Sequence, residues 1–309
     1  MRILVTGASG FVGRGLGPAL VRAGHVVRAA ARDATAISPE PAVERVRLPD
    51  LAGEVDWTPL LDGADAVVHL AGIAHRSGVE AGDYDRVIRH ATAALARECA
   101  ARRLPLVFVS SIGAQTGSAA DHVVRETDPP RPVTAYDRAK LAAEAAVREA
   151  GGAFTILRPP LVYGPGVKGN MALLMRIADR PWPLPLGAFR NRRSLVARDN
   201  LAEAVAFCLA TPATRGETYV VADREALSVA EMIAVLRTAC GRPQRLIPVP
   251  PPLIGGLLCA AGRAATWDRI GGALVVDPGK LLAAGWRPAV DTRAGLAAMM
   301  RAYRSAARA

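Results

Sequence analysis

A tyrosine and a lysine four residues apart, Tyr136 and Lys140, are the first candidates for chemistry in this sequence. Residues at this spacing lie on one face of a helix, so their side chains can point together into one cleft. The pKa of an isolated phenol is about 10, and a nearby ammonium favours the phenolate and lowers that pKa. The pair is therefore suited to general acid/base catalysis. A structural alternative is that Lys140 pairs with Glu144 at the next turn.

A serine at a predicted strand end strengthens the catalytic interpretation. Ser111 closes the run LVFVSS, and its hydroxyl could hold a substrate oxygen while Tyr136 transfers the proton and a nicotinamide transfers hydride. The chain has 36 arginines and only three lysines, so a lysine at position 140 indicates a role that arginine does not fill. Ser111, Tyr136 and Lys140 are the predicted catalytic residues.

A glycine-rich turn, LVTGASGFVG, joins the first predicted strand to the first predicted helix. Its glycines, Gly7, Gly10 and Gly13, let the backbone turn tightly and approach a pyrophosphate, while the helix N-terminus offers free N–H groups to the anion. The spacing is GxxGxxG rather than the GxGxxG of the dinucleotide fingerprint. The place of the turn, between strand and helix at the start of the chain, favours cofactor binding over a purely structural turn.

The end of the second predicted strand bears on the choice between NAD(H) and NADP(H). An acid there would accept hydrogen bonds from the ribose hydroxyls, whereas an arginine can pair with a 2′-phosphate. The run VVRAAARD places Ala31 at the strand end, followed by Arg32 and Asp33, which favours NADP(H). NAD(H) stays possible if Arg32 is only solvated and Asp33 reaches the ribose. Downstream, Asp50 and Leu51 are predicted to bracket the adenine.

Apolar runs of strand length alternate with longer helical patterns through the first two-thirds of the chain. This alternation is typical of βαβ units, so we predict an α/β fold with a doubly wound parallel sheet, the Rossmann fold. The predicted strands are Arg2–Thr6, Val26–Ala31, Ala66–Leu70, Leu106–Ser110, Phe154–Leu157 and, returning late, Glu217–Asp223. The predicted helices between them are Val12–Ala23, Tyr84–Ala101 and Tyr136–Ala150.

Beyond Tyr163 the sequence changes to Pro- and Gly-rich connections such as YGPGVKGN, RPWPLPLG and IPVPPP, which favour loops. They bracket short predicted helices at Met171–Ala178, Val229–Thr238 and Arg293–Tyr303. We expect a small α/β substrate-binding lobe above the carboxyl ends of the strands. The predicted dinucleotide-binding domain is 1–163, with 193–223 returning to its sheet, and the predicted lobe is 164–192 with 224–309.

Composition narrows the possible partners. The net charge is +11, but the arginines are scattered and aromatic residues make up only 5% of the chain, so solvated arginines are favoured over a nucleic-acid interface. No apolar run reaches the roughly 18 residues of a membrane span, and the start lacks the pattern of a signal peptide, so we expect no membrane contact and a cytoplasmic location. The four cysteines, Cys99, Cys208, Cys240 and Cys259, have no metal-site spacing and are interpreted as reduced core residues.

Taken together, five segments resemble the extended short-chain dehydrogenase/reductase family of the NAD-dependent epimerase/dehydratase type. They are TGASGFVG, VVHLAG, VSS, YxxxK and LRPPLVYGPG, and they occur in the order and spacing of that family over essentially the whole chain. In the family, the lysine matching Lys140 also hydrogen-bonds the nicotinamide ribose while it tunes the tyrosine. The resemblance implies these cofactor-binding residues: Gly7, Ser9, Gly10, Phe11, Val12, Gly13, Arg32, Asp50, Leu51, Leu70, Ala71, Gly72, Ser110, Tyr136, Lys140, Pro159 and Leu161.

The resemblance also suggests a nucleotide-sugar substrate. The segment NRRSLVARDNLAEAV, Asn191 to Val205, resembles the motif that grips the diphosphate, with Arg193 as the matching position and Arg192 as a helper. The implied substrate-binding residues are His75, Ser111, Asn170, Arg192 and Arg193, with no metal. Sugar dehydratases of the family carry an Asp-Glu pair just after the serine, whereas Ile112 and Gly113 follow Ser111, which disfavours dehydration.

Late segments such as GGALVVDPGKLLAAGWRP most resemble bacterial 4-ketoreductases and epimerases of UDP-linked N-acetylated 6-deoxy sugars, enzymes of polysaccharide synthesis. The 4-ketoreductase is favoured, because Arg32 suits an exchangeable NADPH; a 4-epimerase with tightly bound NAD is the alternative. Two further alternatives are a non-catalytic NAD(P)-binding regulator and an enzyme acting on a steroid, flavonoid or small aldehyde.

Two features of the resemblance concern the helix at 84–101. The family usually carries an Asn four residues before a Thr, whereas this chain has Ile88 before Thr92, so the bonds of that Asn must be replaced. Family members often form homodimers through a four-helix bundle. The resemblance therefore implies a possible homodimer through the predicted helices Tyr84–Ala101 and Tyr136–Ala150.

Overall fold

The computed structural model describes residues 1–73, 78–260, 262 and 271–307. Its centre is a seven-stranded sheet in which every neighbouring pair of strands is parallel. The strands, in spatial order, are β11 (Glu217–Val220), β7 (Phe154–Arg158), β5 (Leu106–Val109), β4 (Ala66–His69), β1 (Arg2–Thr6), β2 (Val26–Ala31) and β3 (Val43–Arg47). The order reverses between β1 and β4, so the predicted doubly wound α/β sheet is confirmed.

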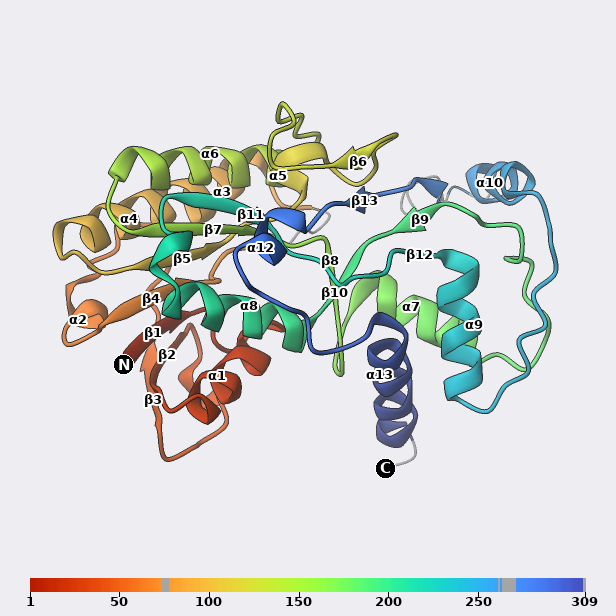
Figure 1. Cartoon of the computed structure of the whole chain (residues 1–309), viewed down its shortest axis with the longest axis horizontal. Helices are drawn as coiled ribbons and strands as arrows, with labels where there is room; N and C mark the ends of the chain where they lie inside the picture. The colour runs from red at the N-terminus through yellow and green to blue at the C-terminus, as the bar shows by residue number, and fades with distance from the viewer. Residues whose placement is uncertain (74–77, 261, 263–270, 308–309) are drawn as a thin grey trace.

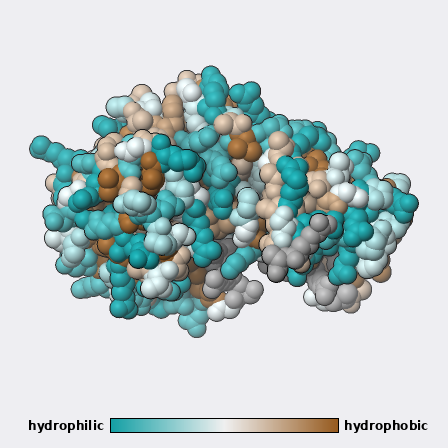
Figure 2. Space-filling view, turned by 90° about the horizontal axis from the view of Figure 1, so that it is seen from below, coloured by the Kyte–Doolittle hydropathy of each residue, from teal (hydrophilic) through white to brown (hydrophobic). Residues whose placement is uncertain are grey.

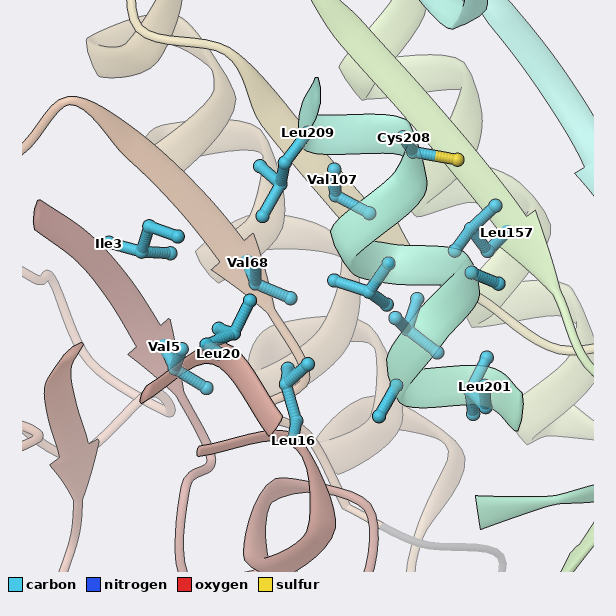
Figure 3. Packing of buried hydrophobic residues seen from close by; sticks show 14 of the residues in the cluster. Ile3, Val5, Leu16, Leu20, Val68, Val107, Leu157, Leu201, Cys208 and Leu209 are labelled. Carbon is cyan, nitrogen blue, oxygen red and sulfur yellow. The ribbon is translucent and has the colours of Figure 1, made fainter. Parts of the chain in front are cut away.

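Helices cover both faces of this sheet (Figure 1). On one face lie α1 (Gly13–Arg22) and α8 (Arg198–Ala210), and on the other α4 (Ala91–Ala101) and α6 (Ala135–Ala150). Figure 3 shows Leu16 and Leu20 of α1 beside Val5 and Val68 of the strands, with Leu201 of α8 farther along the same layer. Each such side chain contributes about 1.5–3 kcal/mol when fully buried.

The sequence of α6 explains its boundaries. Thr134 and Asp137 form a capping box, in which each side chain accepts a hydrogen bond from the other residue's backbone N–H. The helix ends at Gly151, whose φ of 72° lies in the left-handed region that favours glycine. These two signals place Tyr136 in the first turn of α6, with Lys140 one turn later.

The rest of the chain forms a second group of elements beside the sheet (Figure 1). Its apolar cluster includes Met175, Phe189, Ile233 and Met299. The helices here are α7 (Gly169–Ala178), α9 (Val229–Ala239), α10 (Pro251–Ala260) and α13 (Thr292–Ala306). Short strand pairs join β8 (Leu161–Tyr163) to β10 (Leu195–Ala197), β9 (Arg192–Arg193) to β12 (Leu227–Ser228), and β6 (Val123–Val124) to β13 (Val275–Val276). The division into two functional domains stays a prediction.

Smaller elements complete the described chain. They are η1 (Ala34–Ala36), α2 (Thr58–Leu61), α3 (Ala81–Tyr84), η2 (Asp85–His90), α5 (Gly113–Thr116), η3 (Pro212–Thr214) and α12 (Gly279–Ala283). The η2 segment is a π-helical turn between α3 and α4, so the predicted helix from Tyr84 to Ala101 is helical throughout but not uniformly α. Ile88 of η2 is buried in the core, while the Thr92 hydroxyl lies 3.1 Å from His69 Nε2. The apolar packing of Ile88 and the contact between Thr92 and His69 thus replace the hydrogen bonds of the Asn that the family usually carries.

Some expectations from the sequence were wrong or incomplete. Strand β3 and helix α8 were not predicted, and the Pro-rich run ending at residue 252 leads directly into α10 rather than remaining a loop. Three cysteines are buried as expected, but Cys259 is exposed. The face seen in Figure 2 is mostly hydrophilic, with hydrophobic residues in small separate groups.

Candidate active site

The glycine turn lies where the carboxyl ends of β1 and β4 diverge, which is the usual ligand site of an open parallel sheet. Gly7 has φ of +73°, and a Cβ there would lie 2.8 Å from the backbone nitrogen of Ala71. A Cβ at Gly13 would lie 2.5 Å from the Ala8 carbonyl oxygen. Glycine at these two positions is therefore required for the turn to pack between the two strand ends.

A cavity of about 310 Å³ opens beside this turn, and we call it the catalytic cavity. It brings together twelve of the residues predicted for the cofactor and for catalysis. These are Gly7, Gly10, Phe11, Val12, Gly13, Leu70, Gly72, Ser110, Ser111, Tyr136, Lys140 and Pro159. The wall is completed by Ile73, Val109, Pro160 and Val162, which were not predicted.

Six predicted cofactor residues do not line this cavity: Ser9, Ala71 and Leu161, and the three near the adenosine, Arg32, Asp50 and Leu51. Ser9 uses its carbonyl to accept a hydrogen bond from Arg14 Nε at 2.9 Å, and Ala71 is buried against the glycine turn. Leu161 is 39% exposed because the alternation of β8 turns its side chain away, while Val162 next to it faces the cavity.

Tyr136 and Ser111 meet through their hydroxyls. Ser111 hydrogen-bonds Tyr136 and also accepts a hydrogen bond from the Gly113 backbone N–H at 3.1 Å. The Tyr84 ring packs edge-on against the Tyr136 ring, with the centroids 5.8 Å apart. Burial raises the pKa of Tyr136 to about 12, although the Ser111 hydrogen bond opposes this shift. The prediction that Lys140 lowers this pKa is therefore wrong for this structure, in which burial dominates and the groups that act besides it are Ser111, Asp137 and Tyr84.

Lys140 is almost fully buried at 5% exposure, one helical turn beyond Tyr136. Its ammonium donates a hydrogen bond to the Val109 carbonyl oxygen at 3.0 Å and lies 4.8 Å from the centroid of the Phe108 ring. Burial lowers the pKa of Lys140 to about 8, while the charge of Glu144 acts in the opposite direction. The alternative of a simple Lys140–Glu144 pair is wrong, because Glu144 pairs with Arg158 at 2.5 Å and with Arg148 at 3.0 Å.

A second hollow, of about 400 Å³, lies at the carboxyl ends of β2 and β3. We call it the arginine hollow, because it is lined by Arg32, Arg47, Leu48, Pro49 and Asp50. Both arginines are exposed, and neither forms an ion pair with a residue that the structure describes. Arg47 was not predicted; the parallel register that sets it opposite Ala31 brings it to Arg32.

The other residues predicted near the adenosine behave differently. The carboxylate of Asp33 is engaged locally. It accepts hydrogen bonds from the backbone N–H and the hydroxyl of Thr35, at 2.9 and 2.6 Å. Leu51 is buried in the core at 6% exposure. Only Asp50 of the predicted adenine pair lines the hollow.

The predicted substrate residues are dispersed. Arg193 donates hydrogen bonds to the carbonyl oxygens of Gly272 at 2.6 Å and Ser118 at 2.8 Å, and burial lowers the pKa of its guanidinium. Arg192 points to the other side of β9, where it lies 3.6 Å from Glu231. Asn170 is exposed near the start of α7, and His75 lies outside the described residues. Arg193 is therefore the member of the set whose charge has no carboxylate partner among the described residues.

Comparison with known proteins agrees with this geometry. The model of the NAD dependent epimerase/dehydratase family matches residues 3–222, which include the glycine turn, the catalytic cavity and Arg193. The chain belongs to this family. The prediction of an enzyme of the epimerase/dehydratase type is thereby confirmed.

Relatives within the family carry out more than one reaction. A UDP-glucose 4-epimerase from Vibrio cholerae is 30% identical, and the alignment covers 97% of this chain and 95% of the relative. A ceramide reductase from Caulobacter vibrioides is 28% identical, with 87% of this chain and 78% of the relative covered. The crystal structure of a Bacillus cereus UDP-glucuronic acid 4-epimerase in complex with NAD has the same fold, with a TM-score of 0.75, 20% identity, and coverage of 98% of this chain and 99% of that one.

Gly113, two residues after Ser111, lies against the start of α6. A side chain at Gly113 would collide with the Asp137 carboxylate at the start of α6. That Ile112 and Gly113 after Ser111 disfavour dehydration stays a prediction. Among the described residues, none of the helices is both long and apolar enough to cross a membrane.

Proposed function

We propose that this protein is an NAD(P)-dependent oxidoreductase that reduces the 4-keto group of a nucleotide-linked sugar, of the UDP-4-keto-6-deoxy-N-acetylhexosamine type. The observation that carries the proposal is the catalytic cavity, in which the hydrogen-bonded hydroxyls of Ser111 and Tyr136 stand opposite the glycine turn, with Lys140 beside them.

The side chains of the cavity divide the work of a carbonyl reduction. A bound nicotinamide supplies the hydride that adds to the carbonyl carbon. Ser111 holds the carbonyl oxygen, and Tyr136 donates its phenolic proton to that oxygen as the negative charge develops. Lys140 then stabilises the phenolate that remains, because its ammonium lies in the same wall at low exposure.

The substrate class rests on Arg193 and on the relatives. A guanidinium whose acceptors are carbonyl oxygens has no carboxylate to neutralise its charge, which suits a diphosphate. Two of the similar proteins are named as 4-epimerases of UDP-sugars, one of UDP-glucose and one of UDP-glucuronic acid. We assign residues 164–192 and 224–309 to substrate binding, with Arg193 reaching toward them from β9.

The cofactor preference rests on the arginine hollow. Two exposed guanidinium groups at the ends of β2 and β3 supply positive charge where a 2′-phosphate would lie, and Asp33 is engaged by Thr35. These features support NADP(H), which a reductase must bind and release at each turnover.

A second candidate is a UDP-sugar 4-epimerase, which would use the same three catalytic residues with tightly bound NAD. The Vibrio cholerae relative, aligned over nearly the whole of both chains, favours it. A non-catalytic regulator is less well supported, because Ser111, Tyr136 and Lys140 are all present and share one cavity.

The deciding experiment is to denature the freshly purified protein and identify the released nucleotides by mass spectrometry, then to assay turnover. We expect little bound nucleotide, and NADPH oxidation with a UDP-4-keto-6-deoxy-N-acetylhexosamine. Stoichiometric NAD together with interconversion of UDP-glucose and UDP-galactose would replace this proposal with the epimerase. Binding of NADPH without turnover of any UDP-sugar would instead favour the regulator or an enzyme for another carbonyl substrate.

The assignment of Arg193 has its own test. Arg193→Ala should raise the KM for the UDP-sugar by about 10- to 100-fold, since a charged hydrogen bond to phosphate is worth about 1.5–3 kcal/mol. Arg190→Ala, which removes an exposed arginine three residues earlier, is the control and should leave KM within about twofold. An unchanged KM in Arg193→Ala would point to a substrate without a diphosphate.

A further inference from the structure

Glu144 lies directly behind the catalytic cavity and is fully buried at 0% exposure. One of its carboxylate oxygens accepts hydrogen bonds from the Ser110 hydroxyl at 2.6 Å and from Arg158 Nε at 2.9 Å. The other accepts from Arg158 Nη2 at 2.5 Å and from Arg148 Nη2 at 3.0 Å. The carboxylate therefore ties α6 to the carboxyl ends of β5 and β7.

The network continues from Arg158 around the catalytic serine. Arg158, itself 3% exposed, donates through Nη1 to the Gln115 side-chain oxygen. Gln115 belongs to α5, just beyond Ser111, and its amide nitrogen donates to the Asp128 carbonyl oxygen at 2.5 Å. The segment that carries Ser111 is thus held on one side by Glu144 through Ser110 and on the other by Gln115.

Glu144 is also in register with the catalytic face of α6. Tyr136, Lys140 and Glu144 follow one another at intervals of four residues, so they lie on one side of the helix over successive turns. Tyr136 hydrogen-bonds Ser111, and Glu144 hydrogen-bonds Ser110, the residue before it. Two adjacent serines of one strand end are thereby paired with two positions of one helix face.

We propose that Glu144 is a positioning residue, which holds the strand end bearing Ser111 against the helix face bearing Tyr136 and Lys140. The ordinary alternative is a buried ion pair that only stabilises the fold. The claim about hydride transfer rests on the proposed function, whereas the claim about the environment of Lys140 does not.

The environment of Lys140 gives the proposal a readout that needs no substrate. Among the described residues, the groups around this ammonium are the Phe108 ring and the Val109 carbonyl of β5, His69 of β4 and Glu144 of α6, with Tyr136 in the same cavity wall. His69 is neutral, because burial lowers its pKa to about 3. Glu144 is thus the negative charge that opposes the effect of burial on Lys140, and its charge raises the pKa of Lys140.

Two variants of Glu144 separate the effect of its charge from that of its shape, and a third variant is the control. Glu144→Gln keeps the shape and removes the charge, whereas Glu144→Asp keeps the charge and withdraws it from Ser110. Glu44→Gln is the control for the loss of a glutamate–arginine pair elsewhere, since the half-exposed Glu44 pairs with the buried Arg28 at 2.9 Å on β2 and β3, away from the cavity. If Glu144→Gln destabilises the protein too far to be purified, Glu144→Asp and Ser110→Ala still test the positioning step.

The first measurement is NMR of protein labelled with ¹³C at the lysine ε-carbon. The sequence has only three lysines, Lys140, Lys168 and Lys280, so Lys140→Arg assigns the signal. We expect the Lys140 midpoint near pH 8 in the parent, below that value in Glu144→Gln, and restored in Glu144→Asp. Lys168 and Lys280 should titrate alike in all variants. An unchanged Lys140 midpoint in a folded Glu144→Gln variant would overturn the electrostatic half of the proposal.

The second measurement is the single-turnover rate of hydride transfer. Glu144→Gln, Glu144→Asp and Ser110→Ala should each slow it by about 10- to 100-fold with little change in KM, because the reacting groups are displaced rather than removed. Glu44→Gln should keep the parent rate. Parent-like rates in Glu144→Gln, Glu144→Asp and Ser110→Ala would show that Glu144 only forms a structural ion pair. If the parent itself turns over no UDP-sugar, the proposed function fails, and the lysine titration still decides the environment of Lys140.

Discussion

The catalytic cavity and the arginine hollow lie at the same edge of the sheet but hold their charges in opposite ways. Around the catalytic cavity, Lys140, Glu144 and Arg158 are each at most 5% exposed, and each has protein partners. In the arginine hollow, Arg32 and Arg47 are exposed and have no ion pair among the described residues. One site holds its charged groups in buried hydrogen bonds within the fold, whereas the other presents unpaired charge to solvent.

Under the proposed function, this difference separates catalysis from recognition. Groups that must stand at fixed distances from a reacting carbon are held by buried hydrogen bonds, since small displacements are costly there. Groups that attract an anionic part of a ligand can remain mobile and solvated, because a charge acts over a longer range and the ligand completes the pairing. We therefore expect substitutions at the catalytic cavity to change rates and stability, and those at the arginine hollow to change affinity alone.

The largest effect is expected from Tyr136→Phe, which removes the proton donor and keeps the ring. The hydroxyl is the group that meets Ser111 in the cavity, so the rate of carbonyl reduction should fall by about 10³-fold, within the usual range for a general acid. Stopped-flow measurement of NAD(P)H oxidation under saturating substrate tests this. Tyr303→Phe on α13, outside the catalytic cavity, is the control and should keep the parent rate.

The affinity of Tyr136→Phe for NADPH sharpens the comparison. It should stay within about threefold of the parent, because the arginine hollow is intact. A variant that kept full turnover would show that another group supplies the proton, and the catalytic assignment would have to be abandoned.

The next largest effect is expected from Lys140→Met, which should abolish activity but increase the stability of the folded protein. Burial lowers the pKa of Lys140 from 10.5 to about 8, which corresponds to about 3 kcal/mol of unfavourable free energy at about 1.4 kcal/mol per pKa unit. The methionine leaves the Val109 carbonyl without its hydrogen-bond donor, and this loss cancels about 1 kcal/mol of the gain from removing the buried charge. The free energy of unfolding should therefore rise by about 2 kcal/mol while activity is lost.

The pH dependence of that gain fixes its cause. Between pH 8 and 10.5 the unfolded parent still binds the Lys140 proton and the folded parent does not, so the parent gains stability as the pH rises. The advantage of Lys140→Met should be greatest below pH 8 and fade toward 10.5, as measured by urea unfolding at a series of pH values. Lys280→Met, at a half-exposed pair with Glu217, should change stability by less than about 1 kcal/mol at any pH. A pH-independent gain would assign the effect to apolar packing.

Much of the catalytic cavity could be predicted because its signals are local. The glycine turn, the YxxxK spacing and the serine at a strand end each depend on a few neighbouring residues, and the structure brings them together. Strand β3 was missed because VERVR alternates charged and apolar residues at the edge of the sheet, so it lacks the continuous apolar run of the inner strands. Helix α8 was not predicted because it is buried on several sides, so its sequence lacks a clear division into an apolar and a polar face.

The rest of the site depends on contacts between distant segments. Arg47 reaches Arg32 only through the register of β2 and β3, and Glu144 meets Arg158 only through the packing of α6 on β7. Local spacing predicted that Lys140 would lower the pKa of Tyr136, but it carries no information on burial, which raises that pKa to about 12. Likewise, the adjacent arginines of β9 point to opposite sides, so only Arg193 keeps a charge without a carboxylate partner among the described residues.

The smallest effect is expected at the arginine hollow, and it tests the comparison from the other side. Arg32→Ala and Arg47→Ala should each weaken NADPH binding by about tenfold, or about 1.4 kcal/mol, since each removes one exposed guanidinium from the 2′-phosphate. NADH, which lacks that phosphate, should bind each variant as it binds the parent. Fluorescence titration of both nucleotides measures the difference.

The control is Arg45→Ala, which removes an exposed arginine of β3 two residues before Arg47 and outside the hollow. It should leave both affinities unchanged. Equal losses for NADPH and NADH would mean that the two arginines bind the shared part of the cofactor, and an effect on rate would break the separation between the two sites.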